Sequence, residues 1–117
     1  MIVKVILLGT LLATSYRPVA WQTSPGCTDR QHCVTAIGEN VSELGVAVSR
    51  DLLQSGEVHY GDLLWIDRVG WRIVNDTMGP KARQAIDVFV YTYKEEKSFG
   101  IKHLKVYRIE VTNGQNR

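Results

Sequence analysis

The sequence predicts an all-β fold, a small closed barrel of six strands with one or two short helices. Short runs rich in β-branched and aromatic residues recur along the chain, separated by turn-forming Gly, Pro, Asn and Asp. Helical patterns are confined to two brief segments. Several connections are longer than a hairpin turn, and such crossovers favour a closed barrel over a simple meander.

The length and charge of the chain limit its organisation and its partners. A chain of 117 residues can bury one core, so we expect a single domain over residues 1–117, with the barrel spanning about 11–110 and a loose tail at 111–117. The composition, 44% hydrophobic and 22% charged, is typical of a folded globular protein, and the net charge of +2 predicts no nucleic-acid partner. We interpret the cluster of Lys102, Lys105 and Arg108 as a solvated strand face. No motif indicates a cofactor.

The N-terminal segment "MIVKVILLGTLLATS" has two interpretations. Its β-branched and apolar residues suit a buried first strand, which is the interpretation we favour. A lysine followed by nine largely apolar residues also fits a signal-peptide core, although cleavage after Ala13 would leave Leu11 where a small residue is expected. The apolar run is too short to cross a bilayer, so no integral membrane span is predicted.

A long stretch without predicted elements, residues 19–41, contains both cysteines. Cys27 and Cys33 lie in "SPGCTDRQHC", and the five residues between them could close a small disulfide ring in an oxidising compartment. In a reducing compartment two free thiols are expected. Together with His32 the pair does not match a zinc-binding spacing, so no metal site is predicted.

The remaining elements follow at regular intervals. Segment 62–76 is typical of a hairpin, because two apolar runs flank a turn ending in Gly70. Gly100 is placed to end a short helix. In chain order we expect a strand at 45–49, a helical turn within 50–58, strands at 63–66 and 71–75, a strand at 85–92, a short helix at 94–100 and a last strand at 102–111.

An aspartate stands inside the predicted strand "AIDVFVYT". Because successive side chains of a strand point to opposite faces, Ile86, Val88 and Val90 are predicted to face the barrel interior. Asp87 then lies on the outer face with two aromatic rings, Phe89 and Tyr91.

A second aspartate, Asp76, ends the preceding strand. The same alternation groups Asp76 with Arg72 and Val74. Whether Asp76 meets Asp87 depends on strand pairing, which sequence spacing does not determine. From the local sequence alone, Asp76 could be a turn residue that binds the backbone, and Asp87 an edge-strand charge.

Several motifs resemble, in order, those of the three-aspartate (3D) domain family, which includes the catalytic barrel of membrane-bound lytic transglycosylase A and of stationary-phase and resuscitation-type cell-wall proteins. The resemblance covers about residues 13–110. The matching stretches are "ATSY" (13–16), "TAIG" (35–38), "VAVS" (46–49), "YGDLLWI" (60–66), "NDTMG" (75–79), "IDVFV" (86–90) and "KSFG" (97–100).

The resemblance implies a six-stranded double-psi β-barrel that acts on peptidoglycan glycan strands. It places the catalytic acid and base on Asp87 and a second family aspartate on Asp76. The third family aspartate falls on Ser49, so one carboxylate of the set is missing. Asp51 would share a face with Ser49 if the strand continued, and could partly substitute. Met78 stands where the family has a glycine.

Two functions are therefore expected as alternatives. The first is a peptidoglycan-cleaving enzyme of the lytic transglycosylase type; the second is a non-catalytic double-psi module that binds cell wall or forms part of a larger assembly, such as a phage particle. Either implies the cell envelope, the extracellular space or a virion. Candidate substrate-binding residues are Tyr16, Ser49, Asp51 and Thr77. Trp21, Trp65 and Trp71 could include a sugar-stacking surface, but hairpin packing is the preferred interpretation for Trp65 and Trp71.

Overall fold

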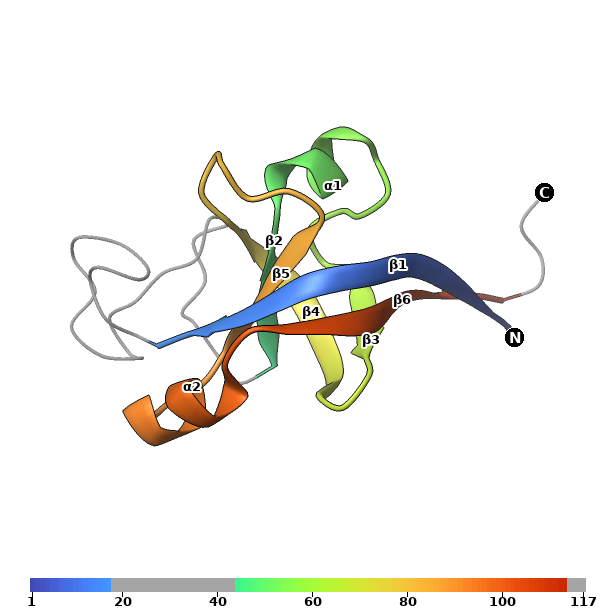
Figure 1. Ribbon diagram of the computed structural model, residues 1–117. Coiled ribbons are helices and arrows are strands. Elements are labelled where there is room, and N and C mark those ends of the chain that lie inside the picture. Colours follow the sequence, from blue (N-terminus) through green and yellow to red (C-terminus); the bar gives the residue numbers. More distant parts are fainter. Residues whose placement is uncertain (18–43, 114–117) are drawn as a thin grey trace.

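The computed structural model describes residues 1–17 and 44–113, which form a closed six-stranded barrel (Figure 1). Around the barrel the strand order is β1-β5-β2-β4-β3-β6. The elements are β1 Ile2–Tyr16, β2 Gly45–Val48, α1 Arg50–Gln54, β3 Leu63–Ile66, β4 Gly70–Thr77, β5 Ala85–Phe89, α2 Tyr93–Phe99 and β6 Lys102–Thr112. The predicted all-β barrel with two short helices is confirmed. Trp21, Cys27 and Cys33 lie outside the described residues, so the disulfide remains a prediction.

The N-terminal segment forms a strand, as the favoured interpretation predicted, but the expectation that this strand is buried was wrong for its first half, where Ile2, Val3, Val5 and Leu7 are exposed. The C-terminal part of β1, from Leu12 to Tyr16, pairs in parallel with β5, and nearly the whole of β1 pairs antiparallel with β6. The pairing of β1 with β6 extends beyond the predicted barrel limits. Ile2 pairs with Thr112 and Val3 with Val111, so the sheet begins about nine residues earlier than expected and β6 continues into the segment predicted to be a loose tail.

The barrel interior is filled by aliphatic side chains from all six strands. Alternation along β5 sends Ile86 and Val88 inward, as predicted, while β5 ends at Phe89, three residues before the predicted strand end. Leu52 on α1 packs against the same core. The fully or nearly fully buried core residues are Leu11, Ala13, Val46, Val48, Leu52, Val58, Leu64, Ile66, Val74, Ile86, Val88, Leu104 and Val106.

The second helix, α2, is capped at both ends, of which only the Gly100 end was identified from the sequence. Thr92 accepts a hydrogen bond from the backbone N–H of Glu95, and the Glu95 carboxylate accepts one from the backbone N–H of Thr92, which is a capping box. Gly100 ends the helix with φ 62°, a conformation that favours glycine. Neither helix in the described part of the chain has the length and apolar character needed to cross a bilayer.

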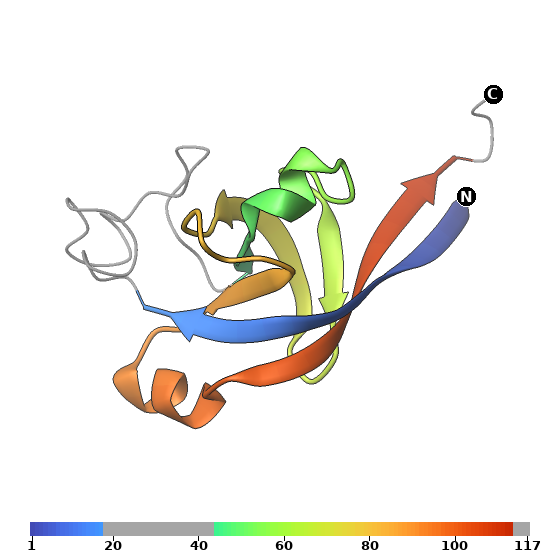
Figure 2. The same cartoon turned by 45° about the horizontal axis from the view of Figure 1, so that its top comes forward.

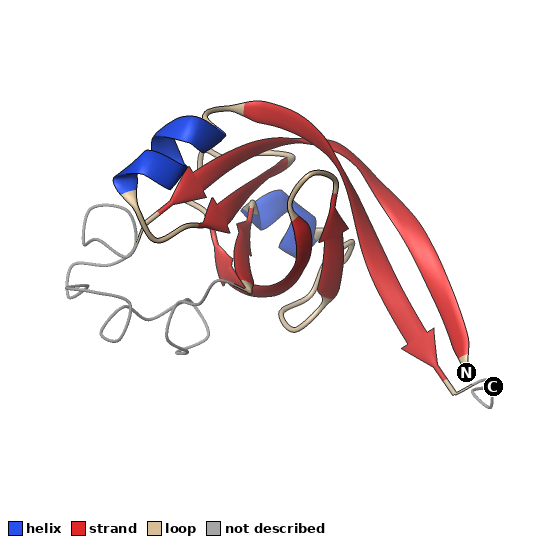
Figure 3. Ribbon diagram, turned by 90° about the horizontal axis from the view of Figure 1, so that it is seen from below, coloured by secondary structure: helices blue, strands red, loops and turns tan. Residues whose placement is uncertain are grey.

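Strands β1 and β6 extend beyond the others as a two-stranded ribbon (Figure 2). Among the described residues, positions 2–11 of β1 pair with β6 alone, with Leu8 as an extra residue at a bulge, because pairing with β5 begins at Leu12. Figure 3 shows this ribbon curving away from the barrel, with both described chain ends near its tip. Leu12 and Ala13 of β1, by contrast, pair with both β5 and β6, and the strand then continues along β5 to the residues predicted to be functional.

Candidate functional site

Asp87 lies in the middle of β5 on the outer face of the barrel, as the alternation predicted. That face is not bare surface, because Phe89, Tyr16 and Ala47 form a second buried cluster on it. Phe89 contacts Tyr16 and Tyr91 in edge-to-face ring pairs, with ring centroids 5.6 Å and 4.9 Å apart. The Asp87 carboxyl is consequently half-buried beside aromatic rings.

Asp76 reaches the same outer face through an irregularity in β4. Val46 pairs with Val74, but the next residue of β2, Ala47, pairs with Asp76, so Asn75 is an extra residue in β4. Such a bulge reverses the alternation of side chains beyond it. The prediction that Asp76 shares a face with Val74 was therefore wrong: Val74 is in the core, whereas Asp76 lies opposite Ala47 on the outer face.

The two aspartates flank one residue of the central strand. Ala47 on β2 pairs with Asp76 of β4 on one side and with Asp87 of β5 on the other. The small Ala47 side chain lies between the two acidic residues. Their mutual repulsion contributes to the raised pKa of Asp87, so the two charges act on each other.

Thr14 is a site residue that the sequence interpretation missed. In the parallel pairing of β1 with β5 it lies opposite Asp87, and its hydroxyl donates a hydrogen bond of 2.8 Å to Asp87 Oδ1. Thr14 is two positions before Tyr16, which was selected, so the two side chains share a face of β1. The "ATSY" motif contained the signal, since alternation from Tyr16 leads directly to Thr14.

The pKa of Asp87 is raised from its usual 3.8 to about 6. Burial of the carboxyl is the main cause, and the negative charges of Asp76 and Glu96 add to it, while the Thr14 hydrogen bond opposes the shift. A carboxyl with this pKa exists in both protonated and ionised forms near neutral pH, which is what a group that both donates and accepts a proton requires.

Tyr16 places a hydroxyl near both aspartates. Its side chain is 3% exposed, and its hydroxyl has no hydrogen-bond partner within the described residues. Burial, together with the charges of Asp76 and Asp87, raises the pKa of the Tyr16 phenol well above its usual range. The group therefore remains an O–H donor at all physiological pH values.

Ser49 and Asp51 serve the backbone instead of extending the carboxylate pair. Ser49 is fully buried, and its hydroxyl accepts a hydrogen bond of 3.1 Å from the Ala85 backbone N–H. Asp51 accepts hydrogen bonds from the backbone and side-chain amides of Gln84. The strand continuation that would have aligned Ser49 with Asp51 was wrong, because β2 ends at Val48 and α1 begins at Arg50.

Thr77 takes part in strand pairing at the edge of the site. Its hydroxyl donates to the Val48 carbonyl over 3.3 Å, and its backbone N–H donates to Asp76 Oδ1 over 2.9 Å. Thr77 also lines an open depression with four other residues, Arg50, Leu53, Gln54 and Tyr60.

Glu96 on α2 is a further acidic group close enough to raise the pKa of Asp87. Arg17, directly after β1, forms an ion pair of 3.0 Å with Glu96, and its guanidinium lies over the Tyr93 ring. These contacts attach α2 to the end of β1 beside the aspartates. The sequence offered no signal for this, because Arg17 and Glu96 are 79 positions apart.

Comparison with known proteins adds no identification. No protein-family model matches the chain, and no curated protein matches it significantly. Within residues 1–17 and 44–113, no group of three His, Cys, Asp or Glu side chains is arranged to hold a metal ion.

Proposed function

We propose that the chain is a peptidoglycan-cleaving enzyme of the lytic transglycosylase type, with Asp87 as its single acid and base. The half-buried Asp87 carboxyl, with its pKa near 6, is the observation that supports this most. The double-psi connection of the barrel and the relation to the 3D family are part of the same proposal. Its substrate would be the bond between N-acetylmuramic acid and N-acetylglucosamine in the glycan strand.

One carboxyl can carry out both proton transfers of this reaction. Protonated Asp87 donates its proton to the glycosidic oxygen as the bond to the anomeric carbon breaks. The ionised carboxylate then removes the proton from the 6-hydroxyl of the same muramic acid residue, whose oxygen bonds to the anomeric carbon. The product is a 1,6-anhydro sugar, no water is consumed, and Asp87 ends protonated as it began.

The neighbours of Asp87 have distinct roles in this scheme. Negative charge on Asp76 stabilises the oxocarbenium-like sugar that develops between the two steps. The Tyr16 hydroxyl, which stays protonated, places an uncharged O–H group beside both aspartates. Thr14 holds the Asp87 carboxyl in a fixed orientation through its 2.8 Å hydrogen bond.

The non-catalytic alternative is favoured by one specific observation. Ser49 occupies the third aspartate position and binds the Ala85 backbone, while Asp51 is engaged with Gln84. Neither supplies a third carboxylate to the outer face. A barrel with this arrangement could bind glycan strands without cutting them, as a wall-binding or structural module of a larger assembly such as a phage particle.

Digestion of purified peptidoglycan separates the two functions. We expect mass spectrometry to find 1,6-anhydro-muropeptides after incubation with the protein, and Asp87→Asn to reduce their rate of formation by about 10²-fold or more. Asp67→Asn is the matched control, because Asp67 is an exposed carboxylate in the β3–β4 turn. Sedimentation with sacculi without any product would support the binding module. Reducing ends in place of anhydro ends would indicate a hydrolase, contrary to the proposal.

A further inference from the structure

We propose that the outer apolar face shared by β1, β6, β3 and β4 is a self-association surface, on which the projecting β1–β6 ribbon of one copy packs against the aromatic side chains of a second copy. Residues that the enzyme proposal uses, Thr14, Tyr16, Asp76 and Asp87, do not lie on this surface. The inference is therefore independent of the proposed activity, and either could fail alone.

The outer face is apolar where a solvated barrel wall would be polar. An antiparallel strand with one solvated face normally alternates apolar and polar residues. Here β3 sends Leu64 and Ile66 into the core and still carries Trp65 on its outer side, 37% exposed. Trp71 of β4 is 48% exposed and packs edge-to-face against Trp65, with ring centroids 4.7 Å apart.

Strand register makes this face continuous across four strands. Trp71 pairs with Trp65, Trp65 with Tyr107, and Tyr107 with Leu7. Directly paired residues of antiparallel strands lie on the same face, so these side chains form one row. A second row is formed where Val5 pairs with Ile109.

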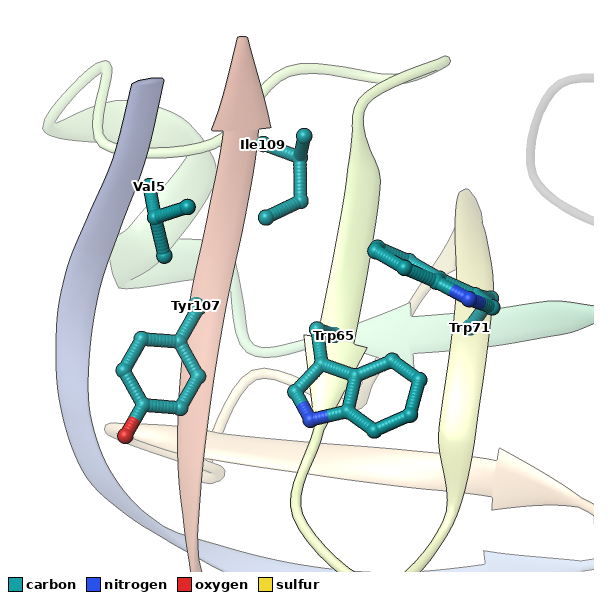
Figure 4. A pocket seen from close by; sticks show the side chains of 5 residues that line it. All are labelled: Val5, Trp65, Trp71, Tyr107 and Ile109. Carbon is teal, nitrogen blue, oxygen red and sulfur yellow. The ribbon is translucent and has the colours of Figure 1, made fainter. Parts of the chain in front are cut away.

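The face has a hollow part and a projecting part. The hollow part is a shallow depression of about 280 Å³ (Figure 4). Its lining, which we call the aromatic wall, consists of Trp65, Trp71, Tyr107, Val5 and Ile109. The projecting part, the arm, is the ribbon tip, where Val3 pairs with Val111 and both are more than half exposed. In a two-fold interface the same patch of both copies must be complementary to itself. A hollow beside a projection meets this condition, because the arm of each copy can lie on the aromatic wall of the other copy.

The amount of apolar surface agrees with a second copy as the occupant. The exposed side chains of the arm and the wall together present on the order of 700 Å², close to the ~800 Å² that each partner buries in a standard interface. This exceeds the apolar patch of a typical monomer. A two-stranded ribbon is also only marginally stable alone in water, so covering the arm stabilises it.

The chemistry of the face disfavours other occupants. None of the five described residues that line the aromatic wall is Lys or Arg, so phosphate groups of a nucleic acid or of anionic lipids have no partner within the depression itself. Glycan recognition needs hydrogen-bonding groups for sugar hydroxyls, and the wall is lined almost entirely by apolar atoms. Because the residues that line the wall are uncharged, the walls of two copies can meet without opposing like charges.

Analytical ultracentrifugation over roughly 1–100 µM tests the proposal, since standard interfaces of modest strength dissociate in this range. We expect the wild-type mass to approach twice the monomer's 13.2 kDa. Val3→Glu on the arm and Trp71→Lys on the wall should each raise the dissociation constant by about 10-fold or more. His103→Glu is a control, being an exposed substitution on β6 away from the side chains of the arm and the wall.

The double variant Val3→Glu/Trp71→Lys distinguishes contact from misfolding. Because the arm of each copy meets the wall of the other, the introduced charges attract across the interface and should restore association lost in both single variants. A monomeric wild type over the whole range, single variants with unchanged dissociation constants, or a double variant no better than the singles would each overturn the proposal. So would flotation of monomeric protein with phosphatidylcholine vesicles, which would assign the face to a lipid surface.

Discussion

The Thr14 hydroxyl and the Asp87 carboxylate are joined by a 2.8 Å hydrogen bond between two parallel strands whose residues are 73 positions apart. The bond favours the ionised form of Asp87, whereas burial and the charges of Asp76 and Glu96 favour the protonated form. The pKa of about 6 is the balance of these opposing effects.

Removing the Thr14 hydroxyl should raise the pKa of Asp87 above about 6, because only the opposing effects remain. Thr14→Val is close in shape, and Thr14→Ser keeps the hydroxyl as a control. A carbon-detected NMR titration of the Asp87 carboxyl measures the change. Equal titration curves for Thr14→Val and the wild type would show that the hydrogen bond does not influence the carboxyl.

Neutralising Asp76 should lower the pKa of Asp87, since a repelling negative charge is removed. The same substitution, Asp76→Asn, should lower the pKa of the Tyr16 phenol. Both groups can be followed by NMR, with Asp67→Asn as the control for a distant carboxylate. If neither group responds, the two aspartates do not interact across Ala47.

Asp87 should make the protein less stable as pH rises. Its folded pKa of about 6 lies above its usual 3.8, so its favourable contribution to stability is complete below pH 3.8 and is lost as pH rises through 6. The loss is on the order of 3 kcal/mol. Asp87→Asn should therefore unfold at a higher urea concentration than the wild type at pH 7, with the two converging near pH 4. Parallel stability profiles would contradict this.

Gly45→Ala should destabilise the barrel by about 1–3 kcal/mol. A β-carbon at Gly45 would lie 2.6 Å from Nδ2 and 2.8 Å from Oδ1 of the buried Asn75 side chain. Gly79→Ala is a matched control, because a β-carbon there meets no atom within 4 Å. Urea unfolding of both variants compares the two sites. Equal losses of stability would show that Asn75 can move aside.

Ser49→Ala should cost about 1–3 kcal/mol, because the Ala85 backbone N–H would lose a buried hydrogen-bond partner. Peptidoglycan binding should be unchanged if Ser49 serves only the backbone. Thermal unfolding and sacculus sedimentation measure the two effects. Normal stability with impaired binding would return Ser49 to the substrate-binding residues.

Local sequence patterns predicted the elements and the outer position of Asp87. Two-residue alternation is a property of the strand itself, so Ile86 and Val88 could be assigned to the core without knowledge of their neighbours. The capping signals of α2 are equally local. The six-stranded closed barrel followed from the number of strands and their long connections.

Features that depend on pairing could not be predicted. The hydrogen bond from Thr14 to Asp87 requires the parallel register of β1 and β5, and the attachment of Arg17 to Glu96 requires the same pairing. The sequence around Asn75 contains no pattern that indicates a β-bulge. Asp51 was expected to share a face with Ser49 and to replace the missing carboxylate, which required β2 to continue. Strand β2 instead ends at Val48, and α1 packs on the core directly after it.

The extra residue at Asn75 means that chain length, and not only side-chain identity, determines where Asp76 points. Deleting one residue from β4 would leave every acidic side chain in the sequence and yet turn the Asp76 carboxylate toward the aliphatic interior. Substitutions at Asp76 or Asp87 can change the charges of these residues. Only an insertion or deletion can change whether the two side chains lie on the same face of the barrel sheet. Related chains that keep both aspartates should accordingly tolerate changes in side chains along β4 far better than changes in its residue count.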